Sequence, residues 1–370
     1  MDKNLEKAII KVNKSLWDKE RVAKVAKEGL YEVWFTMVGD HERGEAYWIR
    51  YTLMVPKKKI KVPADQNLDE FIDKLGGDGM LWLGYFNKND SSKNFIIKKK
   101  FPLSAVDGSK VISESKYLII KIQDAEVYLD RIKGGFETQS GKKIKWELEF
   151  SHFMEPYVGT PDIAKKIGLT NSLAKATHPN LRISGNITIN GDSKEIKNAS
   201  GIHYHTYGTG YLVPWEWFSA HTIENSPDGY ADLGYKVEKG VIEVFDGEKT
   251  LTPWNQKFTK KVKVMKKIKR ERSLTNLSFS VEHDNIALEG EVSVPMDALV
   301  GVEYFGPLGN SFYCYNSEIA DLKLIVKISD KEGNLIEEKE LIAEKSVSFE
   351  TVYDTPQEGI KYLPYDKEEL

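Results

Sequence analysis

The chain has 370 residues and a formal net charge of −3, with 41% hydrophobic and 29% charged residues. This composition is typical of a globular protein of about two domains, and the charge argues against nucleic acid as a partner. The single cysteine, Cys314, excludes an internal disulfide framework and is typical of a reducing compartment. No stretch resembles a signal peptide or is long and apolar enough to span a bilayer, so we expect a cytoplasmic protein.

A helix is predicted for residues 3–28, within an N-terminal segment 1–29. Leu5, Ile9 and Val12 recur at the spacing of one apolar stripe, and Gly29 can end the helix. Lysines and glutamates fill the opposite face. We expect the helix to pack on the body of the protein, and a lid or membrane-surface helix is the alternative.

The rest of the chain follows the period of two that is typical of β-strands. The pattern is clearest where Ile144, Trp146, Leu148 and Phe150 alternate with Lys and Glu, which predicts a strand with one buried face at 143–150. The other predicted strands are 31–38, 46–55, 80–87, 94–101, 117–123, 126–132, 215–224, 230–238, 241–245, 257–268, 276–282, 286–295, 311–316, 322–328 and 335–343, with a hairpin over 181–196.

A Trp-Phe pair opens each half of this β region, at Trp34-Phe35 and again at Trp217-Phe218. An acidic, Gly-containing turn and an aromatic strand follow each pair. Together with the many short strands, this echo predicts an all-β fold of two tandem antiparallel barrels or sandwiches. The predicted boundaries are 30–200 for the first domain, 201–350 for the second and 351–370 for a C-terminal tail.

Residues 198–221 concentrate histidines and aromatic residues between glycines. Glycines loosen the backbone there, and Pro214 fixes it again just before two tryptophans. This density of rings indicates the edge of a cavity. The residues that we expect to contact a ligand are Tyr207, Tyr211, Trp215, Trp217, His203 and His221.

The segment 194–247 resembles the hydroxyneurosporene synthase (carotenoid 1,2-hydratase) family and its lipocalin-like relatives, among them tocopherol cyclases and fungal lipocalin-like Diels–Alderases. The family's motif is a leading Gly, then Asp-His-x-Trp-Gly, then Trp-x-Trp-Phe. The matching positions here are Gly201, His205, Gly208, Trp215, Trp217 and Phe218. The resemblance extends loosely over 30–345, and it implies two lipocalin-like barrels and a hydrophobic, often isoprenoid, ligand.

Two positions depart from the family's motif: Tyr204 stands where the family has Asp, and Tyr207 where it has Trp. In the hydratases that Asp is associated with protonation of an isolated alkene. Its absence favours a lipocalin-like protein that binds a hydrophobic small molecule, an isoprenoid or a lipid, without acting on it. The alternative is an isoprenoid hydratase, cyclase or isomerase that protonates an alkene in the same cavity.

Alkene protonation requires an acid that stays neutral in a dry pocket and rings that stabilise the carbocation. The candidate catalytic residues are Glu216 and Asp232 as acids, His205 as a proton shuttle, and Tyr204. Glu216 would point away from its two neighbouring tryptophans if all three lie in a strand. We expect His205 to face the interior at the domain junction and to hydrogen-bond a tyrosine hydroxyl or a carboxylate.

Metal binding is a second use for the histidines. His203 and His205 would share one face of a strand, and His221 could be a third ligand. No carboxylate stands at a familiar spacing, so we favour structural or pocket histidines and expect no metal. The sequence has no phosphate loop, nucleophile triad or dinucleotide fingerprint, so we expect no cofactor either.

The run 257–272 is rich in Lys and Arg interleaved with apolar residues. We favour a strand with a solvated basic face. The alternative is peripheral membrane contact through anionic lipid headgroups, which would suit a protein that takes up a lipid.

Overall fold

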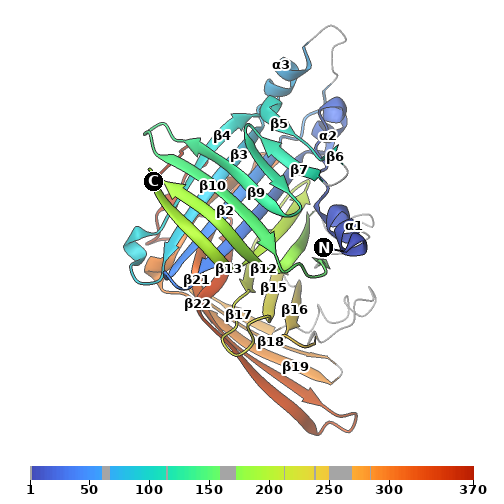
Figure 1. Ribbon diagram of the computed structural model, residues 1–370, viewed down its shortest axis with the longest axis vertical. Helices are drawn as coiled ribbons and strands as arrows, with labels where there is room; N and C mark the ends of the chain where they lie inside the picture. The colour runs from blue at the N-terminus through green and yellow to red at the C-terminus, as the bar shows by residue number, and fades with distance from the viewer. Residues whose placement is uncertain are drawn as a thin grey trace.

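The computed structural model describes residues 2–60, 67–113, 116–158, 172–211, 213–236, 239–249, 269–283 and 285–370. Its strands form two β-sheets, one of 13 strands and one of 10. The first sheet makes a nearly closed barrel and the second a half-barrel, so the predicted all-β fold of two tandem barrels is confirmed. Figure 1 shows the first barrel, blue to green, above the second, yellow to red.

The first sheet contains β1 (Leu30–Asp40), β2 (Glu45–Val55), β3 (Asp78–Asn87), β4 (Phe95–Pro102), β5 (Val106–Asp107), β6 (Lys110–Ser113), β7 (Lys116–Ile122), β8 (Ala125–Tyr128), β9 (Arg131–Glu137), β10 (Lys143–Ser151), β11 (Tyr157–Val158), β12 (Ser172–Ile189) and β13 (Asp192–Gly208). Their order is β4-β3-β2-β1-β13-β12-β10-β9-β8-β7-β5, with β6 and β11 beside β7 and β12. Near the two ends of this order, β3 approaches β5 at Gly79, where an added Cβ would lie 2.6 Å from a methyl carbon of Val106. The absent side chain therefore lets β3 pack closely on β5.

Burial along the strands shows which surfaces the two sheets share. β10 alternates between exposed and buried residues, as predicted, because its outer face meets solvent. β1 and β2, in contrast, are buried at every position. Trp34 and Val38 belong to the core of the first barrel, whereas Val33 and Phe35 belong to the core that extends into the second sheet. The second sheet therefore covers the outer face of β1.

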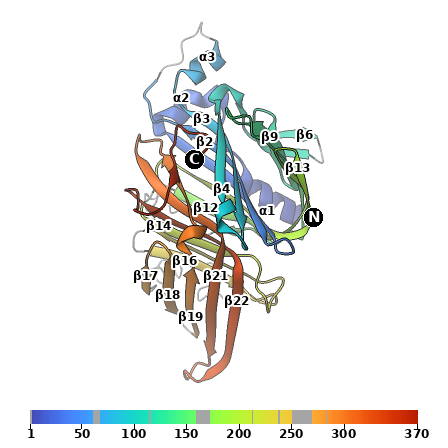
Figure 2. The ribbon, with the colours of Figure 1, turned by 90° about the vertical axis from the view of Figure 1, so that its left-hand side faces the viewer.

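The second sheet contains β14 (Trp215–Ala220), β15 (Tyr230–Lys236), β16 (Lys239–Phe245), β17 (Lys269–Arg272), β18 (Asn276–His283), β19 (Ile286–Ser293), β20 (Val300–Phe305), β21 (Ser311–Ser329), β22 (Leu335–Tyr353) and β23 (Tyr362–Leu363). Their order is β16-β15-β14-β22-β21-β19-β18-β17, and β20 joins β21 to β23. The prediction of separate strands at 311–316 and 322–328 is wrong, because β21 runs through both. The pairing of β21 with β22 shifts register between Ser317 and Leu322, so the strand continues through the polar residues that separate the two predicted strands. The long β21–β22 hairpin extends away from the first barrel in Figure 2.

The prediction of one helix over 3–28 is also wrong in its middle, because α1 (Lys3–Asn13) and α2 (Val22–Glu28) are separate. Between them the indole of Trp17 donates a hydrogen bond to the Val106 carbonyl, 3.0 Å away. The Leu16 amide donates to the Glu32 carboxylate at 2.9 Å instead of to a helical carbonyl. These bonds to the barrel hold the connecting residues out of a helix.

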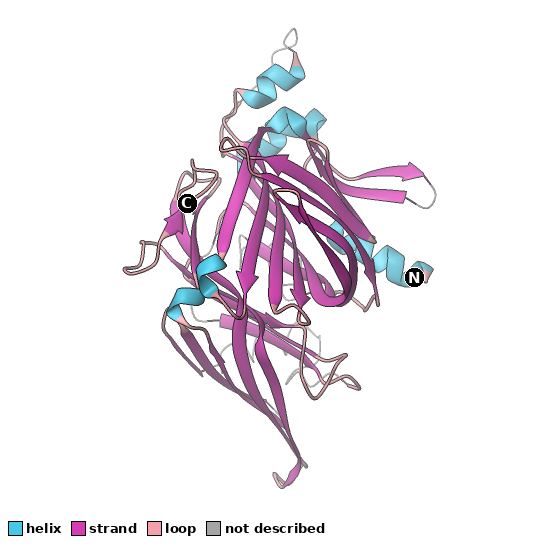
Figure 3. Cartoon of the chain, turned by 60° about the vertical axis from the view of Figure 1, so that its left-hand side comes forward, coloured by secondary structure: helices cyan, strands magenta, loops and turns pink. Residues whose placement is uncertain are grey.

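The other helical elements are short: α3 (Leu68–Asp73) and the 3₁₀ turns η1 (Lys19–Arg21), η2 (Ser91–Lys93), η3 (Leu103–Ala105) and η4 (Met296–Ala298). Figure 3 shows the helices, in cyan, at the margins of the strands. None of the helices in the described part of the chain has the length and apolarity needed to cross a membrane.

The C-terminal residues connect the two sheets. β23 pairs with β20 of the second sheet, and the chain then reaches β4 of the first. There the Lys98 amide donates to the Glu368 carbonyl at 3.0 Å, and its ammonium donates to the Pro364 carbonyl at 2.8 Å. These bonds help to fix how the sheets face each other, and so the shape of the space between them.

Candidate functional site

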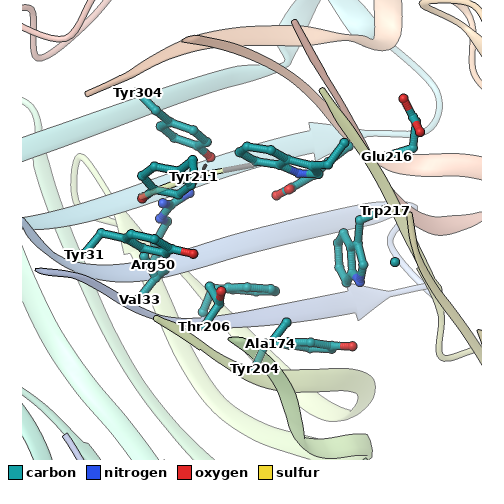
Figure 4. Close-up of a pocket in the computed structure, with 14 residues that line it drawn as sticks. Tyr31, Val33, Arg50, Ala174, Tyr204, Thr206, Tyr211, Glu216, Trp217 and Tyr304 are labelled. Atoms are coloured by element: carbon teal, nitrogen blue, oxygen red, sulfur yellow. Dashed lines mark hydrogen bonds between the residues drawn. The ribbon is translucent and has the colours of Figure 1, made fainter. Parts of the chain in front are cut away.

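A cavity lies where β1, β2, β12 and β13 of the first sheet meet β14, β15, β20 and β22 of the second (Figure 4). Its volume is about 100 Å³. The lining residues are Tyr31, Val33, Phe35, Arg50, Ala174, Tyr204, Thr206, Tyr211, Trp215, Glu216, Trp217, Gly234, Tyr304 and Glu350. Because both halves of the chain supply them, the site requires the packed pair of sheets. We call this space the junction cavity.

Aromatic rings form most of the wall of the junction cavity. Tyr211 lies between Tyr31 and Trp215 in a stack, with ring centroids 3.8 and 5.7 Å apart. Trp217 stands edge-on to Phe35, with centroids 5.6 Å apart. Residues two apart on a strand share a face, which explains how β1 and β14 each present two of these rings. The rings offer flat apolar surfaces to a ligand.

Arg50 brings a positive charge to the same wall. Its side chain is only 5% exposed. Its Nε donates to the Thr52 hydroxyl at 2.9 Å, and Nη1 donates to the hydroxyl of Tyr304. The guanidinium carbon also lies 4.3 Å from the centroid of the Tyr304 ring. Arg50 is therefore held in place by neutral groups.

Asp232 on β15 is a buried carboxyl group beside the cavity. It is 3% exposed, and it accepts hydrogen bonds from the Tyr204 hydroxyl at 2.7 Å and the Trp217 indole at 3.2 Å. Burial raises its pKa to about 7, because desolvation outweighs these hydrogen bonds. Asp232 also lies two residues from Gly234, a lining residue on the same face of β15. A carboxyl group that is substantially protonated at neutral pH thus sits behind two lining rings.

Glu216 has a different environment. It lies between Trp215 and Trp217 on β14, and its carboxylate is directed away from the Trp217 ring in Figure 4. Arg270 and Arg272 of β17 both form ion pairs with it. Two cationic partners favour the ionised carboxylate, so Glu216 is poorly suited to hold a proton for transfer.

His205 lies on the opposite face of β13, inside the first barrel. It is fully buried and bonded to a carboxylate, as predicted, but that carboxylate is Glu32, 3.0 Å from Nε2. Its Nδ1 donates to the Val12 carbonyl at 2.7 Å, and the ring stacks on Trp34 at 4.5 Å. His205 therefore faces the barrel core and not the junction cavity.

Three more predicted residues lie away from the junction cavity. Tyr207 and His203 share the inward face of β13 with His205, where the Lys175 ammonium donates to Tyr207 at 3.0 Å. His203 Nδ1 lies 2.8 Å from the Thr36 hydroxyl. His221 lies near His41, beside Gly39 of β1. Within the described ranges, no group of three or more His, Cys, Asp or Glu side chains could hold a metal ion.

The structure thus brings Tyr204, Tyr211, Trp215, Glu216 and Trp217 to the lining, with Asp232 directly behind it. Sequence reasoning missed the remaining lining residues, which are Tyr31, Val33, Phe35, Arg50, Ala174, Thr206, Gly234, Tyr304 and Glu350. One signal was present. Arg50 is the single charged residue between Ala46 and Val55, in a run that is otherwise aromatic or aliphatic apart from one threonine. A lone charge in such a strand indicates a buried polar site.

The basic run 257–272 lies mostly outside the described residues, and so does the strand predicted at 257–268. Of the residues that are described, Arg270 and Arg272 are engaged with Glu216. This pairing ties β17 to β14 across the open side of the half-barrel. Membrane contact stays a prediction for the rest of the run.

The fold and site define a protein of two β-barrels with an aromatic cavity between them. No protein-family model and no curated protein matches the chain. Similar solved structures include a Nitrosomonas europaea protein described as an AttH (10% identity, 86% of this chain and 92% of that chain, TM-score 0.43). CghA is also similar, with 8% identity over 88% of this chain and 88% of that chain and a TM-score of 0.49. Kievitone hydratase from Nectria haematococca has 9% identity over 92% of this chain and 94% of that chain and a TM-score of 0.40. At such identities and TM-scores these likenesses carry no argument about function.

Proposed function

We propose that the protein binds a hydrophobic small molecule, an isoprenoid or another lipid, with part of it in the junction cavity. The observation that carries this proposal is unfilled space lined by rings from both sheets. Interiors are normally packed without such voids, so a cavity walled by Tyr211, Trp215 and Trp217 is suited to a ligand. Burying an apolar ligand there would contribute about 25 cal/mol per Å² of apolar surface.

The size of the junction cavity limits what enters it. An apolar cavity of about 150 Å³ can hold one benzene molecule. The junction cavity, at about 100 Å³, is smaller than that and matches a single small end group such as one prenyl unit. A longer ligand would therefore place its end group inside and extend its remainder outward.

Gly234 provides a direct test of this proposal. A Cβ built there meets nothing within 4 Å, so a larger side chain would enter the cavity without displacing the strand. We expect Gly234→Ala, Gly234→Val and Gly234→Leu to weaken binding progressively, by about tenfold or more for leucine, which corresponds to ~1.4 kcal/mol. The measurement is tryptophan fluorescence quenching by farnesol and retinol, with the unfolding midpoint of each variant as the control for folding.

Two results would contradict the proposal. The first is that native mass spectrometry of the protein exposed to lipid extracts detects no bound lipophile and neither probe changes the tryptophan fluorescence. Alternatively, Gly234→Leu could bind the probes as tightly as wild type, which would place the ligand elsewhere.

A second candidate function, protonation of an isoprenoid alkene, is favoured by Asp232. When Asp232 is protonated it can donate to the Tyr204 oxygen, which frees the Tyr204 hydrogen for a ligand carbon. The Tyr204 O–H bond breaks and the C–H bond forms in the same step in which the Asp232 proton moves to the Tyr204 oxygen, because the buried Tyr204 has a pKa well above its ordinary value and does not form a free phenolate. Asp232 ends as a carboxylate, and Trp217 and Phe35 offer π faces to the carbocation. Loss of a proton, ring closure or addition of water would then complete isomerisation, cyclisation or hydration.

A further inference from the structure

We propose that Arg50 binds an anionic oxygen of the ligand, so that the ligand is an amphiphile with an apolar body and a carboxylate, enolate or phenolate group. This inference rests on the proposed function, because it concerns the same junction cavity. It goes further by assigning the chemical class of the ligand and the residue that selects it.

The first observation is the cost of placing Arg50 where it is. The side chain is 5% exposed, and burying a charge costs several kcal/mol unless it is paired. Among the described residues, no carboxylate oxygen lies within 4.0 Å of its guanidinium. Glu350 also lines the cavity, and its carboxylate acts electrostatically on Arg50 from farther away without forming an ion pair with it. The neighbours that do contact the guanidinium, Thr52 and Tyr304, are neutral.

The second observation is that the guanidinium has donors to spare. Arginine carries five N–H groups, and the bonds to Thr52 and Tyr304 use one each on Nε and Nη1. Nη2 has no hydrogen-bond partner among the described residues. It is also not among the polar atoms that these residues bury completely without a partner. Nη2 of Arg50 therefore reaches open space, and the space that Arg50 lines is the junction cavity. Figure 4 shows the guanidinium next to Tyr31, Tyr211 and Tyr304 at one end of this space.

The third observation is the surroundings of that open donor. Rings of Trp48, Trp82 and Tyr304 pack around the guanidinium, with centroids 5.3, 5.6 and 4.3 Å from its central carbon. A charge-assisted hydrogen bond is stronger where water is excluded, and a planar guanidinium suits two-oxygen acceptors such as carboxylates. An anionic oxygen on Arg50 would leave the ligand's apolar part against Tyr211 and Trp215. The lining thus provides a cationic donor at Arg50 and an apolar surface at the rings.

The test compares two probes that differ only in charge, retinoic acid and its methyl ester, on the wild-type protein. We expect the acid to bind about tenfold or more tightly than the ester, as a charge-assisted bond predicts. In Arg50→Met the acid should lose that advantage, while the ester should bind as it does to wild type. Arg50→Lys should be intermediate, because an ammonium keeps the positive charge but lacks the planar, fixed donors of the guanidinium. Arg131→Met, on β9, is the matched control and should change neither affinity.

The outcomes separate this inference from the proposed function. If wild type binds acid and ester equally, hydrophobic binding stands and the role of Arg50 is overturned. If neither probe binds, the proposed function itself fails. The comparison of acid and ester on the wild-type protein does not depend on any variant. It therefore tests the inference even if Arg50→Met fails to fold.

Discussion

Replacing Asp232 with asparagine is expected to abolish proton transfer to an alkene bound in the junction cavity while ligand affinity changes little. Asparagine can still accept a hydrogen bond from Tyr204, but it holds no transferable proton. Loss of a general acid typically lowers the rate by about 10²–10⁴-fold. The measurement is turnover of a linear isoprenoid alkene under saturating conditions, with affinity followed separately by fluorescence.

Two comparisons make this result specific. Asp228→Asn, on the exposed loop before β15, removes a carboxylate of the same size and should leave turnover unchanged. Tyr204→Phe should also lower turnover, because it removes the hydroxyl that relays the proton. An Asp232→Asn protein that turns over the alkene at the wild-type rate would refute the relay. A wild type that binds the alkene but never converts it would leave binding as the function.

The raised pKa of Asp232 also predicts how stability depends on pH. Its pKa is about 7 in the folded protein, against an ordinary value of 3.8. Between these two pH values the folded state binds more protons than the unfolded state. The protonated Asp232 therefore adds its whole stabilising free energy to folding below about pH 4, and this stabilisation is lost as the pH rises through 7. The loss is on the order of 4 kcal/mol. Urea unfolding of wild type and Asp232→Asn should show a stability difference that changes over this window, and a constant difference would contradict the burial of a neutral carboxyl group.

The largest loss of stability is expected for Glu32→Leu. Glu32 and His205 are both fully buried, and the Glu32 carboxylate also accepts from the Ser15 hydroxyl and the Leu16 amide, each at 2.9 Å. The Val12 carbonyl can only accept, so His205 Nδ1 carries a hydrogen. Removing one partner of such a buried pair typically costs about 3–5 kcal/mol. Urea unfolding measures this loss.

The same variant should free the N-terminal segment, because Glu32 and His205 hold residues 12–16 against the barrel. We expect faster hydrogen exchange over α1 than in wild type. Glu195→Gln, at an exposed position of β13, is the control and should change the unfolding free energy by less than about 0.5 kcal/mol. If Glu32→Leu matched that control, the pair would have no structural role.

The sequence by itself determined the class of fold. The alternation at 143–150 depends only on which residues meet water on each side of one strand, and β10 has that pattern in the structure. It also showed that rings gather between Tyr204 and Trp217, because that density is local. The break between α1 and α2 was not visible, since Trp17 and Leu16 fit a helical pattern until Val106 and Glu32 compete for their N–H groups.

Only the tertiary structure decided which rings form the site. β1 pairs with β13 in a register that sets Trp34 opposite His205 and Phe35 opposite Tyr204. Residues at alternate positions therefore enter different cores, and a shift of one residue would exchange them. Nothing in the segment itself fixes that register, which is why His205 was expected at the junction. Arg50 and Tyr304, 254 residues apart, meet because the second sheet covers the outer face of the first barrel. A sequence pattern reports that a face is buried, but only the packing of the sheets determines what buries it.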